Sequence, residues 1–134
     1  MKNKFVILLI SVLFLTGCTT NNSATTEKPM ENKFSSLAEL KQAFIDAGGQ
    51  CWDWVESAIP KEITSETGHG ECDSEGVLIL YKDGVNSREE AIAFRSFLIS
   101  LKFKVNLLFG DNWMINSDQV EIVYPKMGGT LMTR

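Results

Sequence analysis

Two stretches of the chain repeat apolar residues at the spacing of an amphipathic helix. The apolar face of the first stretch consists of Leu37, Leu40, Phe44 and Ala47. Ser36 and Glu39 precede it at capping-box spacing, and Gly48-Gly49 supplies a left-handed stop. The second stretch has a capping box at Ser87 and Glu90 and an apolar face of Ala91, Phe94, Leu98 and Leu101. Both patterns predict helices that bury one stripe.

Apolar and β-branched runs between turn signals predict the strands. These runs cover residues 50–55, 76–81, 103–109 and 113–116. Gly110-Asp111-Asn112 is a tight-turn signal, so the last two strands should form a hairpin. Residues 56–74 show no period and contain Pro60, Gly68 and Gly70, which predicts a long loop.

The tail of the chain supports two interpretations. In the first, Ser117 caps a helix whose apolar face consists of Val120, Val123, Tyr124 and Met127. The alternation of Val120, Ile122 and Tyr124 suits a strand instead. Pro125 would disturb the second helical turn. We favour a short, kinked helix that ends at Gly128-Gly129.

The order of these elements predicts the fold class. It favours a small two-layer α+β domain, with an antiparallel or mixed sheet of about four strands covered by two or three helices. Residues 77–109 form a strand–helix–strand unit, long enough for a right-handed crossover. One domain over residues 34–134 fits the usual domain size.

The N-terminus carries an unbroken apolar run behind two lysines. The run, Phe5 to Leu15, matches an export-signal core and is shorter than the ~20 residues of a membrane-spanning helix. It ends in Leu15-Thr16-Gly17-Cys18, which resembles the bacterial lipobox. In proteins with this motif the cysteine thiol receives a diacylglyceryl group, and a peptidase cleaves before it. The alternative is an ordinary cleaved signal with an incidental cysteine.

The lipobox resemblance implies an address and a division of the chain. Residues 1–17 would be a removed lipoprotein signal peptide, and Cys18 would be the lipidated N-terminus. Residues 18–33 are mostly polar and have little to bury, which predicts a flexible tether. The domain would then be extracytoplasmic, anchored to a bacterial membrane by its N-terminal lipid.

Charge narrows the choice of partners. The signal holds two of the 13 basic residues and none of the 17 acidic ones, so the rest of the chain has 11 basic and 17 acidic residues and a formal charge of −6. Net charge therefore argues against binding to nucleic acid or to anionic lipid. Membrane affinity should come from the acyl chains.

Cys51 and Cys72 remain once Cys18 carries lipid. In an exported chain this pair predicts a disulfide, worth roughly 3 kcal/mol for a loop of this length. The alternatives are a metal site with His69 and Glu71 or Asp73, and a Cys/His nucleophile pair. Both require free thiols, so we favour the disulfide and expect neither a metal nor a cofactor.

Two further residue sets are candidates for chemistry. The first is a group of acids between the predicted strands: Glu56, Glu62, Glu66, Glu71, Asp73 and Glu75. Paired carboxylates can cleave glycosides or bind calcium, but the spacing matches no calcium loop and solvated acids are the favoured interpretation. The second set is Trp52, Trp54 and Trp113, which could form a platform for sugar or peptide or could pack in the core.

The domain also resembles a group of small exported bacterial lipoproteins. The shared outline includes an amphipathic helix, Gly48-Gly49-Gln50-Cys51, Cys72 ahead of a hydrophobic strand, Gly110-Asp111-Asn112-Trp113 and Gly128-Gly129. Pro125 departs from the smoother final helix of that group. The resemblance implies fold and address but no reaction.

These observations predict a non-enzymatic interaction module of the cell envelope, with no catalytic residues assigned. Its expected partners are the membrane, through Cys18, and an envelope protein or glycan, but no nucleic acid. The alternative is a small-ligand or glycan binder that uses the tryptophan-bearing strand. A carboxylate-dependent enzyme is the third hypothesis.

Overall fold

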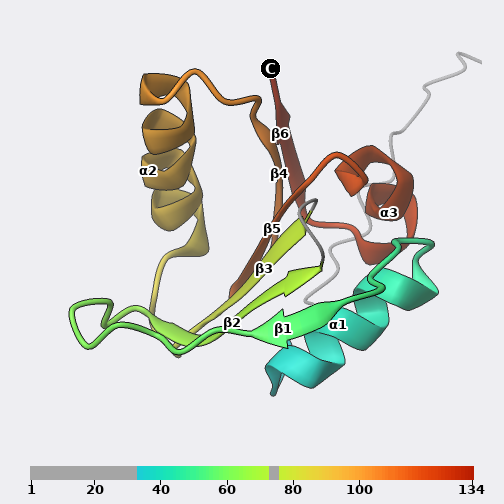
Figure 1. Cartoon of the computed structure of the whole chain (residues 1–134), viewed down its shortest axis with the longest axis horizontal. Coiled ribbons are helices and arrows are strands. Elements are labelled where there is room, and N and C mark those ends of the chain that lie inside the picture. The colour runs from blue at the N-terminus through green and yellow to red at the C-terminus, as the bar shows by residue number, and fades with distance from the viewer. Residues whose placement is uncertain (1–32, 73–75) are drawn as a thin grey trace, which may run out of the picture.

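A computed structural model describes residues 33–72 and 76–134, which form helices and strands in alternation (Figure 1). The predicted signal peptide (residues 1–17) and lipobox lie outside the described residues, as does the predicted tether (residues 18–33) except for Lys33. The helices are α1 (Leu37–Asp46), α2 (Ser87–Ser100) and α3 (Val120–Met127). The strands are β1 (Trp54–Glu56), β2 (Glu66–Cys72), β3 (Gly76–Tyr81), β4 (Asn106–Phe109), β5 (Trp113–Ser117) and β6 (Thr130–Thr133).

The strands form one sheet in the order β1-β2-β3-β5-β4-β6, and every neighbouring pair is antiparallel. The α+β class is confirmed, with six strands where about four were expected. Strand β5 lies between β3 and β4, and β4 lies between β5 and β6. Two connections therefore step across a strand, one through α2 and one through α3. Because β3 and β5 run in opposite directions, connections of one hand must use opposite faces of the sheet.

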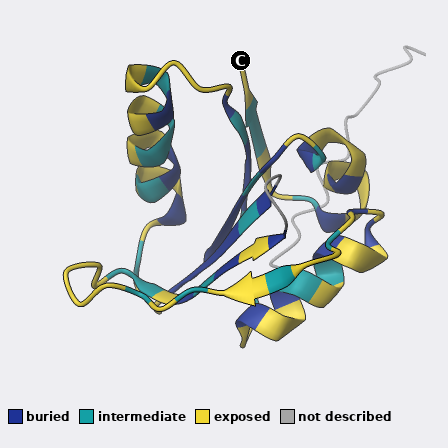
Figure 2. Cartoon of the chain, in the orientation of Figure 1, coloured by how far each residue is buried: buried dark blue, intermediate teal, exposed yellow. Residues whose placement is uncertain are grey.

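Helices cover both faces of the sheet, so the domain has three layers rather than the two expected (Figures 1 and 2). Helices α1 and α3 pack on the face of Leu78 and Leu80, and α2 packs on the face of Ile79 and Tyr81. The reason lies in β3, where residues 78–81 are all buried. A strand that is apolar on both sides needs cover on both sides.

Helix α1 matches its sequence pattern. The Ser36 hydroxyl accepts a hydrogen bond from the Glu39 N–H at 3.2 Å, as the capping box predicts. The Glu39 carboxylate turns to Ser35, from which it accepts the backbone N–H at 2.8 Å and the hydroxyl at 2.7 Å. These two hydrogen bonds hold the pKa of Glu39 below its usual value. Gly48, at φ +107°, ends the helix in the conformation that glycine adopts without strain.

The N-cap of helix α2 is one residue earlier in the chain than the Ser87 that the capping-box pattern predicted. Asn86 is the N-cap, and its side chain accepts the Arg88 N–H at 3.2 Å. Ser87 is the first helical residue, and its hydroxyl donates to the Gly110 carbonyl instead. This contact joins the start of α2 to the β4–β5 turn.

Strand β2 corrects the prediction of a loop over residues 56–74. Its inward positions include Gly68 and Gly70, so the alternation of large apolar residues that marks a strand is missing. Neighbouring side chains fill that space. A Cβ at Gly68 would meet Leu37 at 2.9 Å, and one at Gly70 would meet the ring of Trp54 at 2.2 Å. Conversely, the strand predicted over 50–55 is reduced to β1, which begins only at Trp54.

The tail contains the expected short helix, α3, with Pro125 inside it and Gly128 at its C-cap. Gln119 rather than Ser117 is the N-cap; the Ser117 hydroxyl accepts the Gln119 N–H at 3.1 Å. Strand β6 was missed, because a four-residue edge strand with only two inner apolar residues has no readable period. The hairpin of β4 and β5 is confirmed, with β4 starting at Asn106.

Candidate functional site

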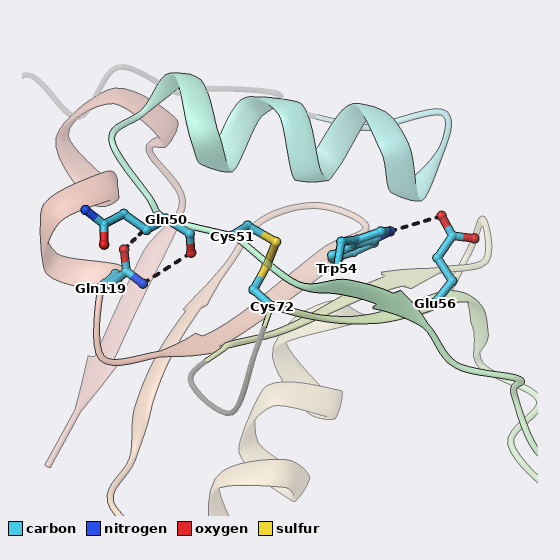
Figure 3. The surroundings of a disulfide bond; sticks show 6 residues. All are labelled: Gln50, Cys51, Trp54, Glu56, Cys72 and Gln119. Atoms are coloured by element: carbon cyan, nitrogen blue, oxygen red, sulfur yellow. Dashed lines mark hydrogen bonds between the residues drawn. A yellow bond between two sulfur atoms is a disulfide. The ribbon is translucent and has the colours of Figure 1, made fainter.

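A disulfide ties the chain leaving α1 to the end of β2 (Figure 3). Cys51 and Cys72 are bonded, with their Cα atoms 4.6 Å apart, which confirms the predicted pairing. Cys72 is buried at 2% exposure. Because both sulfurs are in the bridge, neither serves as a nucleophile or as a thiolate ligand.

Gln50 extends this brace to the third helix. Its N–H donates to the Gln119 side-chain oxygen at 2.7 Å, and its carbonyl accepts the Gln119 amide at 3.4 Å (Figure 3). The segment between α1 and β1 is therefore fixed at two adjacent residues, by a covalent bond at Cys51 and by hydrogen bonds at Gln50.

The side chain of Trp54, the first residue of β1, lies between α1 and the sheet, and it has neighbours in α1 and in β2 (Figure 3). One side lies against Gly70, and the Lys41 ammonium lies 4.9 Å from the ring centroid. The indole N–H donates to a Glu56 carboxylate oxygen at 3.3 Å (Figure 3). These contacts leave Trp54 half-buried and make it part of the fold.

Trp52 differs from the other two tryptophans. It precedes β1 and keeps 78% of its surface exposed, next to the disulfide. Trp113 has no exposed surface and packs edge-on against Phe34, with ring centroids 5.8 Å apart. The three rings therefore do not form one platform, and Trp113 is removed from the predicted ligand surface. Trp52 is the member of the set that presents a ring to solvent.

Strand β1 adds an open edge beside Trp52. It lies at the end of the sheet order and pairs only with β2 among the described strands. Val55, in the middle of β1, is 60% exposed. Sequence analysis did not single out Val55, since the alternation of so short a strand is not visible in one chain. Trp52, Val55 and the free side of β1 together form the surface that we call the disulfide edge.

His69 lies on β2, not in a solvated loop as expected. Its Nδ1 is 3.0 Å from a Glu66 carboxylate oxygen, and both side chains are largely covered. Glu56, Glu62 and Glu71 are exposed, whereas Asp73 and Glu75 lie outside the described residues. Within 33–72 and 76–134, no three His, Cys, Asp or Glu side chains are grouped to hold a metal ion.

Tyr81 is a buried hydroxyl without an evident chemical role. It donates to the Met114 sulfur at 3.8 Å. Burial raises its pKa above the usual value, and the nearby carboxylates of Glu90 and Glu66 raise it further. The hydroxyl therefore stays protonated and contributes packing to the α2 side of the core.

Two open hollows have no tryptophan in their linings. One, of about 380 Å³, is lined mainly by polar residues near the start of α2, among them Lys33, Asp83 and Asn112. The other, of about 360 Å³, lies beyond the end of α2 and is lined by Ile99, Lys102, Phe103, Lys104, Val105 and Arg134. Sequence analysis did not single out this second region, although a run free of acids marks it.

No family model, curated protein or solved structure matches the chain. Among the helices that the structure describes, none has the length and apolar content needed to cross a membrane.

Proposed function

We propose that the chain is a lipid-anchored, extracytoplasmic interaction module of the bacterial envelope, and that it contacts its partner through the disulfide edge. The lipobox Leu15-Thr16-Gly17-Cys18 supports the anchor. The Cys51–Cys72 bridge fits an exported chain, because disulfides persist in oxidising compartments. The observation that carries the binding proposal is Trp52, which is 78% exposed next to a covalent brace.

A protein partner is the best match to this geometry. Tryptophan is over-represented among the few residues that dominate binding energy at protein interfaces. The bridge at Cys51 restrains the backbone next to Trp52, so less conformational entropy is lost on binding. The free side of β1 offers backbone groups to an added strand, and Val55 offers an apolar contact beside it.

Site-specific crosslinking in intact cells tests this proposal. A photoreactive phenylalanine analogue would replace Trp52 in the full chain, and the matched control would carry it at Ile122, which is 61% exposed on α3. We expect one discrete adduct from position 52 and none of that mass from position 122. With that partner in hand, Trp52→Ala should weaken binding by about tenfold or more. Equal adducts from both positions, or none from position 52, would contradict the proposal.

A glycan is the second candidate partner, because an exposed indole ring can also stack on a sugar. The two hollows described above are not lined by a tryptophan, so such binding would be open and shallow. Calorimetric titration of envelope glycan fragments into the full chain separates the two partners. A saturable heat change that Trp52→Ala abolishes would favour the glycan.

A further inference from the structure

The outer face of α2 is apolar over its last three turns. The six exposed residues between 92 and 101 are all uncharged: Ile92, Ala93, Ser96, Phe97, Ser100 and Leu101. The hydroxyls of Ser96 and Ser100 donate to carbonyls of the helix itself, at 2.9 and 2.7 Å. Ile92, Phe97 and Leu101 are 45%, 55% and 48% exposed (Figure 2 shows this outer side). A helix at a protein surface normally turns charged side chains outward, so this apolar face is suited to being covered by another surface.

The turn after α2 presents a lysine and a phenylalanine at some cost in backbone strain. The Lys102 N–H donates to the Ile99 carbonyl at 3.0 Å, and the Phe103 N–H donates to the Leu98 carbonyl at 2.9 Å. This is the Schellman pattern, in which glycine is the usual residue at the left-handed position. Here that position is Lys102, at φ +61°, and the following Phe103 is 63% exposed. A strained lysine beside an exposed ring suggests a use beyond helix termination.

Positive charge collects at this end of α2. Residues 91–110 contain no Asp or Glu in a chain with 17 acids, and they include Arg95, Lys102 and Lys104. Arg134 joins Lys102 and Lys104, because its backbone N–H bonds to the Val105 carbonyl at 3.0 Å and all three residues line the same hollow. A helix C-terminus favours nearby cations, but that effect does not require exposed aromatic rings.

We propose that this surface docks on the anionic headgroups of the bilayer to which the chain is anchored, an inference that rests on the proposed lipid anchor. We call it the α2 surface and define it by Ile92, Phe97, Leu101, Lys102, Phe103, Lys104 and Arg134. The apolar side chains enter the interface and the cations lie among the headgroups, as in interfacial helices. The formal charge of −6 over residues 18–134 had argued against anionic lipid, but this charge is unevenly distributed.

The area of the surface favours a bilayer over a second copy of the chain. Its four large apolar side chains are about half exposed, and such side chains offer roughly 150–250 Å² each, so the apolar area is on the order of 400 Å². A stable protein interface buries about 800 Å² on each partner. A bilayer requires no such area when the chain is already held beside it, since tethering raises the effective concentration.

The position of the chain entry allows both contacts at once. Phe34 exchanges two hydrogen bonds with Asn112, at 3.0 and 2.9 Å, in the turn that also contacts the start of α2. The chain thus enters at the end of α2 opposite to Lys102, about 21 Å away along its 14 residues. The 15 residues from Cys18 to Asn32 reach at most about 50 Å. The lipid and the α2 surface can therefore contact the same bilayer.

Lysine footprinting on vesicles tests this orientation without altering the fold. The lipidated full chain would be reconstituted in phosphatidylcholine vesicles with or without phosphatidylglycerol and labelled with an impermeant amine reagent. On anionic vesicles we expect labelling of Lys102 and Lys104 to fall about fivefold, with Lys61 and Lys126 unchanged as internal controls. High salt should restore labelling. Phe97→Ser with Phe103→Ser should restore it too, whereas Ile122→Ser should not.

Three outcomes would overturn the inference. Equal labelling of Lys102 on both vesicle types would show that the surface does not contact anionic lipid. Concentration-dependent protection in detergent without lipid would assign the surface to a second copy. Equal protection of Lys61 would indicate a general effect of surface charge. Flotation with uncharged vesicles reports the anchor separately, so loss of the anchor and loss of docking give different results.

Discussion

Helices α1 and α2 cover opposite faces of one sheet, and they differ in how many of their apolar residues are buried. In α1 the four predicted stripe residues, Leu37, Leu40, Phe44 and Ala47, are all buried. In α2 only Ala91 and Leu98 of the predicted stripe are buried, Phe94 is partly covered and Leu101 is 48% exposed. Further apolar side chains, Ile92 and Phe97, lie on its outer side.

The difference separates what a helix needs for folding from what it presents to a partner. Both helices have a side-chain cap, and both contribute buried residues to a core cluster. For α1 the apolar residues are largely accounted for by the core. For α2 the core accounts for about half, and the remainder faces outward beside cations. The predictions below test this division.

The largest effect should come from replacing matched phenylalanines. Phe44→Ala removes a fully buried ring on α1 and should lower the free energy of unfolding by about 3–5 kcal/mol. Phe97→Ala removes a ring that is 55% exposed on α2 and should change it by less than about 0.5–1 kcal/mol. Chemical denaturation of the full chain measures both. A large loss from Phe97→Ala would mean that α2 uses this ring for stability.

The disulfide should rank next. Cys72→Ser breaks the bridge that braces the α1 side of the sheet and should lower stability by about 2–5 kcal/mol. Denaturation with and without reductant measures this, because reductant should destabilise the native chain but not the variant. Equal sensitivity of both proteins to reductant would contradict the structural role of this bridge.

A smaller effect is expected at the contact between Gly70 and Trp54. An added Cβ at Gly70 would lie 2.2 Å from the indole ring, so Gly70→Ala must displace Trp54 and should cost about 1–3 kcal/mol. Gly76→Ala is the matched control, since its nearest neighbours would be at an ordinary 3.6 Å. If the two variants unfold at the same denaturant concentration, Trp54 is not packed as described.

The smallest effect has the opposite sign. Lys102→Gly relieves a positive φ and should stabilise the chain by up to about 1 kcal/mol. The same change removes a cation from the α2 surface, so binding to anionic vesicles should weaken while stability rises. Lys104→Gly is the control for charge, because residue 104 has no positive φ. If Lys102→Gly lowers stability, the lysine side chain contributes to the fold.

How much of the fold the sequence predicts depends on where large side chains fall. Helix α1 was predicted correctly because its inward positions hold large apolar residues. Strand β2 was missed because Gly68 and Gly70 leave their space to Leu37 and Trp54, which come from other elements. The third layer was missed because the apolar run of β3 does not by itself show which helix covers which face.

The candidate site was predictable in its covalent part and less so in its surface. Cysteine arithmetic identified the Cys51–Cys72 pair, whose partners are unique once Cys18 is set aside. Whether each tryptophan is buried or exposed depends on tertiary contacts: Trp113 is buried in the core, whereas Trp52 is exposed. The α2 surface has a sequence signal, the acid-free run 91–110, that becomes informative only when the exposed side of the helix is known.

The state of Cys18 tests the central claim of a lipid-anchored module most directly. The chain would be extracted from the membranes of its native cells, digested, and its N-terminal peptide measured by mass spectrometry. The account predicts a peptide that begins at Cys18 and carries a diacylglyceryl thioether, absent after Cys18→Ala. An N-terminus upstream of residue 18, or an unmodified Cys18, would contradict it.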